Sequence, residues 1–122
     1  MKEADYVFCT GSIVGRNTFV GLEFPTIVID EAAQMTEAAS TILLKKSLKR
    51  LILVGDPKQL PACVLSEKNV RAGMGRSLME RLMKNNSCLF TMLTTQYRMD
   101  PIISHFPNNQ FYQGKLENGY TV

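Results

Sequence analysis

The sequence lacks the features that mark a membrane or secreted protein. Among its 122 residues, apolar stretches such as Thr26–Ile29 are far shorter than the roughly 18 residues that span a bilayer. We therefore expect no membrane segment. Glu3 and Asp5 stand where a signal peptide has basic residues followed by an apolar run. Secretion is therefore not indicated, and we expect an intracellular protein of the cytoplasm or nucleus.

Cysteine is also scarce. The three cysteines, Cys9, Cys63 and Cys88, are odd in number and widely spaced, which argues against a disulfide framework or a zinc site. Because they stand among apolar residues, we expect buried thiols in a reducing compartment.

Neither sign of charge dominates. Fourteen Lys and Arg residues against 11 Asp and Glu give a net charge of +3, and the pI of 8.8 is below the value of about 9 that indicates nucleic-acid binding from charge alone. An anionic partner is permitted but not required. The length corresponds to one domain or slightly less, at roughly 150 residues per domain.

Short apolar runs alternate with amphipathic segments, a pattern typical of a parallel sheet covered by helices. We therefore predict an α/β fold. The runs at residues 6–9, 27–29, 51–54 and 89–93 predict strands buried on both faces. The polar residues 94–100 interrupt two apolar segments and predict a domain boundary.

Three helices are predicted. Apolar residues recur at helical spacing over 35–43, after Thr36 as the N-cap, and again over 78–83. A third helix is expected to begin at Asp100 and Pro101, because aspartate caps helices and proline suits their first position. Pro107 is expected to disrupt it.

Two carboxylates, Asp30 and Glu31, follow the strand predicted at 27–29. In an open parallel sheet this end of a strand faces the ligand crevice. One carboxylate can hold Mg²⁺ through water while its neighbour polarises an attacking water. The alternative is an ordinary loop that begins with two acidic residues.

The strand predicted at 51–54 ends in a similar way. Gly55 permits a tight turn or a close backbone approach, and Gln59 offers a donor and an acceptor to a phosphate. The alternative is a simple Gly-Asp-Pro turn.

A third set of polar residues follows the fourth predicted strand. Arg98 can neutralise a transferring phosphoryl group and Tyr97 can stack on a base. The alternative is that these are ordinary polar side chains at the protein surface.

Taken together, these segments resemble a known family. Residues 30–34 (DEAAQ), 55–61 (GDPKQLP) and 96–99 (QYRM) are similar to motifs II, III and IV of superfamily 1 helicases, in the family's order. The closest resemblance is to the Upf-like branch of nonsense-decay, senataxin and immunoglobulin-mu-binding helicases. Residues 4–10 and 106–112 are similar to the segment before motif II and to the start of the second RecA-like domain.

The resemblance implies a RecA-like P-loop NTPase fold and an ATP-dependent RNA or DNA helicase that uses ATP and Mg²⁺. Asp30 would coordinate Mg²⁺, Glu31 would activate water and Gln59 would sense the γ-phosphate. Tyr97 would stack on adenine, and Arg98 would reach the γ-phosphate from the second domain. The predicted catalytic residues are thus Glu31, Gln59 and Arg98, and all five residues belong to the nucleotide site.

The resemblance also implies RNA or single-stranded DNA as the partner. Thr10 is the expected phosphate contact, although a hydroxyl at a strand end can simply make a local hydrogen bond. The sequence departs from the family at two places. Asp100 stands where the family often has His, and Ala62-Cys63 replaces a commoner Pro or Thr pairing after motif III.

The sequence contains no G-x-x-x-x-G-K-[ST] phosphate loop and none of the family's motifs V and VI. It therefore resembles an internal fragment, with residues 1–93 as the later part of the first RecA-like domain and residues 94–122 as a linker and the start of the second. We expect this chain alone to be inactive. The alternative function is a non-catalytic RecA-like remnant or binding module.

Overall fold

The computed structural model describes residues 3–122. The chain forms two compact units, Met1–Cys88 and Leu89–Val122, which we describe separately. The boundary predicted between residues 93 and 94 falls inside the second unit. The assignment of the two parts to successive RecA-like domains stays a prediction.

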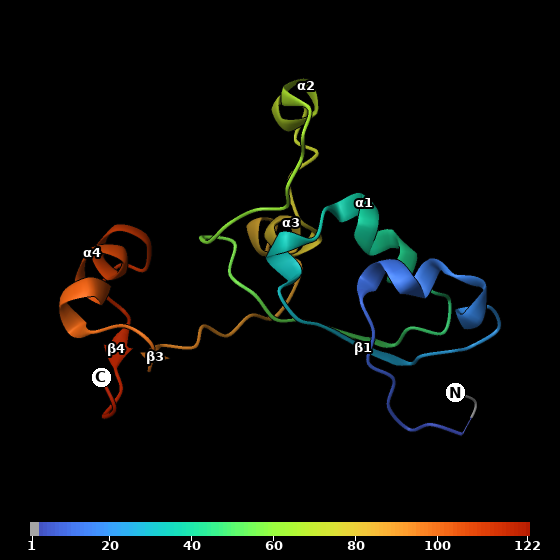
Figure 1. Ribbon diagram of the computed structural model, residues 1–122, viewed down its shortest axis with the longest axis horizontal. Coiled ribbons are helices and arrows are strands. Elements are labelled where there is room, and N and C mark those ends of the chain that lie inside the picture. The colour runs from blue at the N-terminus through green and yellow to red at the C-terminus, as the bar shows by residue number, and fades with distance from the viewer. Residues whose placement is uncertain (1–2) are drawn as a thin grey trace. The chain divides into compact units, whose positions relative to one another are not determined.

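Helices and short strands alternate in both units (Figure 1). The first unit contains the 3₁₀ helices η1 (Gly11–Gly15), η2 (Asn17–Phe19), η3 (Ala32–Gln34) and η4 (Thr41–Leu43), the strands β1 (Thr26–Ile29) and β2 (Arg50–Leu53), and the helices α1 (Glu37–Ser40), α2 (Glu67–Arg71) and α3 (Leu78–Lys84). The second unit contains β3 (Thr95–Gln96), α4 (Pro101–Phe111) and β4 (Glu117–Asn118).

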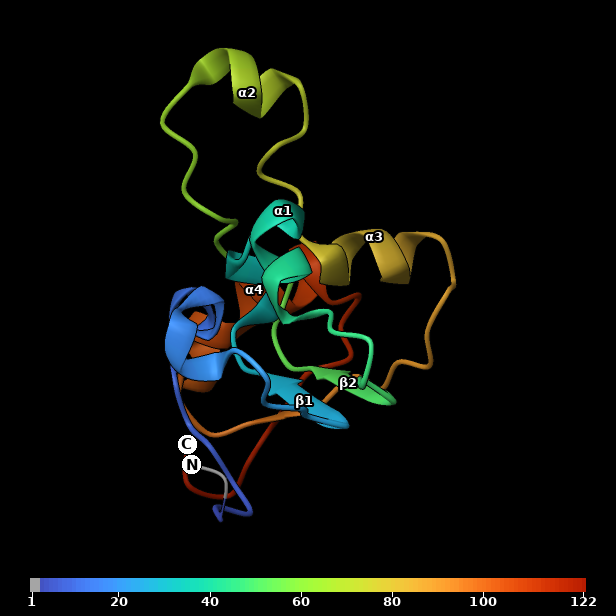
Figure 2. The same ribbon diagram turned by 90° about the vertical axis from the view of Figure 1, so that its right-hand side faces the viewer.

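β1 and β2 form a parallel pair in the first unit (Figure 2). Val28 pairs with Ile52, and the segment between the strands carries η3, α1 and η4. Parallel strands need such a crossover, so the predicted parallel pairing of these runs is confirmed. The core beside the pair consists of buried Ile29, Ala32 and Leu43.

Only one face of this pair is covered in the described part of the chain. Val28, Ile52 and Val54 are 61%, 41% and 44% exposed, whereas Ile29 on the opposite face is buried. The prediction of strands buried on both faces is therefore wrong for this chain. Its helical segments pack against one side and leave an apolar face uncovered.

Two predicted strands do not form. Residues 6–9 and 89–93 have no strand structure, and Tyr6, Phe8 and Leu89 are largely exposed. An apolar run becomes a strand only when a neighbour pairs with its backbone, and no described strand pairs with either run. Cys9 lies in one of these runs, and Cys9, Cys63 and Cys88 are all exposed, against the prediction of buried thiols.

The helix predicted over 35–43 is divided. Thr36 caps α1 as predicted, its hydroxyl accepting a hydrogen bond from Ala39 N at 3.2 Å, but α1 ends at Ser40 and the chain continues as η4. β-branched Thr41 and Ile42 follow directly, and such residues lose side-chain freedom in a helix.

α3 confirms the second predicted helix, and its start is tied to that of α1. Ser77 is 2% exposed, caps α3 by accepting from Glu80 N at 3.1 Å, and forms an isolated bridge with Thr36. The Glu37 carboxylate lies 2.7 Å from Arg81 Nε. This hydrogen bond lowers the pKa of Glu37 from its ordinary value.

The second unit confirms the start of the third predicted helix but not its disruption at Pro107. Asp100 Oδ1 accepts from Ile102 N at 2.8 Å, and Pro101 is the first residue of α4. The helix continues through Pro107 to Phe111. An interior proline removes one helical donor and crowds the carbonyl four residues earlier, but Asn108 anchors the later part of this helix by bonding Leu116 through both side-chain atoms, at 2.8 and 2.9 Å.

α2 was not predicted. It lies on a long loop that extends away from β1 and β2 (Figure 2). No helix among residues 3–122 is long and apolar enough to cross a membrane.

Candidate active site

The two acidic residues of the first motif lie directly after β1. Asp30 Oδ1 accepts from Glu31 N at 3.0 Å, and the Glu31 carboxylate accepts from Gln34 Nε2 at 3.3 Å. Both acidic residues are exposed. The carboxylates are therefore held locally while remaining accessible to a substrate.

Glu31 has an unusual backbone conformation, with φ 51° and ψ 39°. The left-handed region costs a non-glycine residue roughly 1–2 kcal/mol. Asn86 and Gln113, the other non-glycine residues with positive φ in the described chain, follow the ends of α3 and α4, where this conformation is common. Glu31 instead precedes a helix, and such strain is often found at functional sites.

Backbone pairing brings the end of β1 beside the end of β2. Val54 N donates to Ile29 O and Ala32 N donates to Val54 O, both at 2.8 Å. Gly55 then lies against η3, so close that a Cβ there would be 3.0 Å from Ala32 N. The structure thus brings the two predicted polar strand ends together, and Gly55 is needed for this close approach.

Asp56 organises the turn that follows. Its carboxylate accepts from Lys58 N at 2.9 Å and from Gln59 Nε2 at 3.0 Å, and its carbonyl accepts from Gln59 N at 3.1 Å. Gln59 is exposed. The side chain predicted to sense a phosphate is therefore held by Asp56 at the surface beside this strand end.

Tyr97 and Arg98 lie in the second unit, in a turn built around Gln96. The Gln96 Oε1 atom accepts from Arg98 N at 2.9 Å and from Met99 N at 2.8 Å, and its Nε2 donates to Met99 O at 2.7 Å. Tyr97 is 57% exposed and Arg98 is exposed. One half-buried amide group thus fixes the turn and leaves both predicted nucleotide contacts accessible.

Thr10 lies at the start of η1 and is exposed. Its hydroxyl is 3.3 Å from Ser12 Oγ, the kind of local hydrogen bond that is the alternative to a phosphate contact. A hollow of about 520 Å³ adjoins it, lined among others by Gly11, Ser12, Gln34 and Cys63. Gln34 therefore contacts Glu31 and also lines this hollow.

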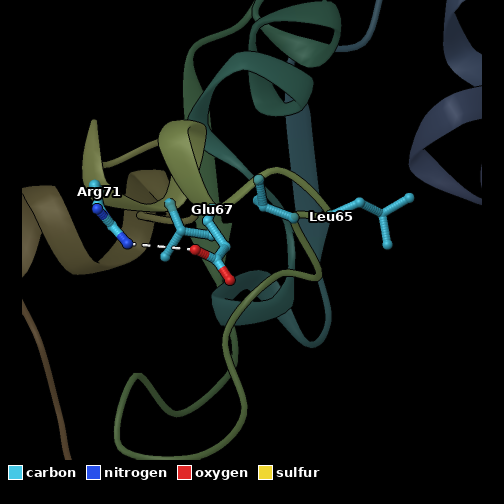
Figure 3. Close-up of a pocket in the computed structure, with 5 residues that line it drawn as sticks. Leu65, Glu67 and Arg71 are labelled. Atoms are coloured by element: carbon cyan, nitrogen blue, oxygen red, sulfur yellow. Dashed lines mark hydrogen bonds and ion pairs between the residues drawn. The ribbon is translucent and has the colours of Figure 1, made fainter.

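A second hollow, of about 260 Å³, lies at α2 (Figure 3) and contains none of the predicted site residues. Its polar groups include Glu67 and Arg71, which form an exposed ion pair of 3.3 Å one helical turn apart. Such pairs contribute little to stability or binding. We therefore place the candidate site at the ends of β1 and β2.

In the described residues, no group of three or more His, Cys, Asp or Glu side chains could hold a metal ion. A single accessible carboxylate such as Asp30 fits Mg²⁺, which keeps several water ligands and takes only one or two carboxylates together with substrate phosphates.

Sequence reasoning missed the residues that hold the predicted ones. Gln34 stands three residues after Glu31, a helical spacing that could have indicated their contact. Asp56 begins a turn, where aspartate commonly bonds the backbone two residues later. Asn118, which accepts a hydrogen bond from Gln96 Nε2, gave no signal because the contact joins distant segments.

Comparison with known proteins identifies the family. Two family models, each described as an AAA domain, match residues 1–67 and 74–122. The chain therefore belongs to the AAA domain family. The predicted RecA-like α/β fold class is confirmed by this membership.

The similar curated proteins carry helicase names or the name of a nonsense-transcript regulator. The chain is 46% identical over 121 residues to Helicase sen1 of Schizosaccharomyces pombe, covering 98% of this chain and 7% of that protein. It is 41% identical over 124 residues to a Regulator of nonsense transcripts 1 homolog of Neurospora crassa, covering 100% and 11%. It is 40% identical over 122 residues to ATP-dependent helicase NAM7 of Saccharomyces cerevisiae, covering 100% and 12%.

The predicted resemblance to the Upf-like branch of superfamily 1 helicases is thereby confirmed. The chain spans only about a tenth of the length of these three relatives.

Proposed function

We propose that the protein carrying this chain is an ATP-dependent helicase that couples hydrolysis of Mg-ATP to movement on, or unwinding of, nucleic acid. The observation that carries the proposal is the backbone pairing of Ala32 N with Val54 O at 2.8 Å. It sets the acidic end of β1 beside the Gly55–Gln59 turn. Binding and hydrolysis groups from two motifs thus share one edge of the sheet.

In this proposal, Asp30 would hold Mg²⁺ through water, and the ion when bound would supply charge neutralisation to the phosphates of ATP. Glu31 accepts a proton from the attacking water, because its carboxylate is exposed and oriented by Gln34. Gln59, whose side-chain amide donates a hydrogen bond to Asp56, contacts the γ-phosphate. Arg98 stabilises the transferring phosphoryl group.

Tyr97 stacks on the adenine, since its ring is more than half exposed and aromatic faces bind bases without needing a specific edge. Thr10 contacts a backbone phosphate of RNA or single-stranded DNA at the margin of the hollow that Ser12 and Cys63 line. We place this activity inside the cell, in the cytoplasm or nucleus, where those polymers occur.

The test is ATP hydrolysis by the full-length protein with and without single-stranded RNA or DNA. The proposal predicts hydrolysis that is stimulated by at least one polymer and is abolished by Asp30→Asn, which also excludes a contaminating ATPase. Nucleotide or nucleic-acid binding without any hydrolysis would instead support the alternative of a non-catalytic RecA-like module.

A further inference from the structure

We propose that Asn118, Gly119 and Tyr120 form a support that positions the Tyr97 ring and thereby sets affinity for the nucleobase. The inference rests on the proposed function, in which Tyr97 stacks on the base. All four residues belong to the second unit, and the contacts between them come from β3, β4 and the residues after these strands.

Asn118 completes the hydrogen bonds of Gln96. The two residues are register partners in the β3–β4 pair, and Asn118 Oδ1 accepts from Gln96 Nε2. The same oxygen lies 2.9 Å from the Oγ atom of Ser104, which is 3% exposed.

With this bond, every donor and acceptor of the Gln96 amide has a partner. A flipped amide would set Nε2 against the N–H groups of Arg98 and Met99. One orientation is therefore fixed. Since that orientation sets the backbone on either side of Tyr97, Asn118 is a positioning residue for the turn.

Gly119 supplies the surface beneath the Tyr97 ring. It is buried, and its N–H donates to Gln96 O at 2.8 Å. A Cβ built at this position would overlap the ring of Tyr97. Because the overlap involves the ring rather than the end of a flexible chain, any side chain here must displace Tyr97.

Tyr120 contacts the ring from its edge. The two ring centroids are 6.1 Å apart at an interplanar angle of 76°, which is the favoured T-shaped geometry of aromatic pairs. Tyr120 itself is 94% exposed, so its contribution to the core is small. Gly119 and Tyr120 together restrict the Tyr97 ring while leaving it 57% exposed for a base.

The test uses polymer-stimulated ATP hydrolysis by the full-length protein, with inorganic tripolyphosphate as a competitive inhibitor that has no base. Gly119→Ala should raise KM for ATP about tenfold, the size of one lost base-stacking contact. The kcat should stay within about twofold, and Ki for tripolyphosphate should not change. A purely structural defect would alter all three constants together.

Asn118 provides a matched pair of variants. Asn118→Leu removes the acceptor for Gln96 Nε2, so the Gln96 amide no longer holds the backbone of Tyr97 and Arg98 in place. KM for ATP should therefore rise and kcat should fall. Asn118→Asp keeps an acceptor at the same place and should stay close to wild type.

Tyr120 provides the control against misfolding, since its exposed side chain can be truncated without disturbing packing. Tyr120→Ala should raise KM for ATP, and Tyr120→Phe should not. If the wild-type protein hydrolyses ATP but KM is unchanged in Gly119→Ala and Tyr120→Ala, the support is refuted and the proposed function stands. If the wild-type protein hydrolyses no ATP, both are refuted.

Discussion

Replacing Gly55 with alanine tests the link between the two strand ends. The added Cβ would be 3.0 Å from Ala32 N, 3.1 Å from Ala33 N and 3.4 Å from Met79 Sδ. The first two neighbours are backbone atoms of η3, and Ala32 N already bonds Val54 O at 2.8 Å. They can retreat only by lengthening the bond that joins β2 to the acidic motif.

Overpacking of this kind costs about 1–3 kcal/mol, which corresponds to roughly 5-fold to 150-fold in the folding equilibrium constant. We expect the free energy of unfolding to fall by that amount in urea titrations of the chain, followed by circular dichroism at low micromolar concentration. In the full-length protein, the same change should lower ATP turnover, because it displaces the backbone next to Glu31.

Gly75→Ala is the matched control. Its Cβ would meet Val64 Cγ2 at 3.8 Å and Ala62 O at 3.9 Å, ordinary contact distances, so stability should change by no more than about 0.5 kcal/mol. Equal stability of the Gly55 and Gly75 variants would refute the close approach as the reason for glycine at position 55.

Three further outcomes are expected. Tyr97→Phe should keep nucleotide affinity and Tyr97→Ala should lose it, because the ring face makes the contact; equal affinities measured by titration would contradict stacking. Ser77→Ala should lower the free energy of unfolding by about 1–2 kcal/mol, because a buried cap of α3 is lost, whereas the exposed cap Ser66 of α2 should cost less; a reversed order in urea melts would argue against the Ser77 cap. Residues 1–122 alone should hydrolyse no ATP above background, because Asp30 lacks a phosphate loop beside it, and should self-associate through exposed apolar surface in light scattering; a monodisperse, active monomer would overturn this.

The sequence predicted structure well where the interactions join residues that are close together in the chain. Thr36, Asp100 and Pro101 begin their helices as expected, because a capping side chain acts on backbone groups two or three residues away. The parallel pairing of β1 and β2 also followed from the pattern, because the helical segment between the two apolar runs supplies the crossover that a parallel pair needs.

Predictions failed where a partner was needed. Residues 6–9 have the composition of a strand but no described strand beside them. Cys9 lies in this run and is exposed rather than buried for the same reason. The disruption predicted at Pro107 failed for another reason, since α4 continues through it and its next turn is anchored by Asn108.

The candidate site likewise contains residues that the sequence could predict and residues that it could not. Asp30, Glu31 and Gln59 could be chosen from strand endings and motif order, and the structure sets their strand ends side by side. The residues that hold the site, Gln34 and Asn118, could not be chosen in this way. Their roles depend on hydrogen bonds that exist only in the folded chain.

The central claim is that the Glu31 carboxylate activates the hydrolytic water. Glu31→Gln keeps the shape of the side chain and removes its basicity, so Kd for ATP and kcat measured on the same full-length preparation test this claim directly. We predict a Kd within a few-fold of wild type and a kcat lowered by orders of magnitude, because only the transition state loses an interaction. Unchanged turnover in Glu31→Gln would contradict the assignment.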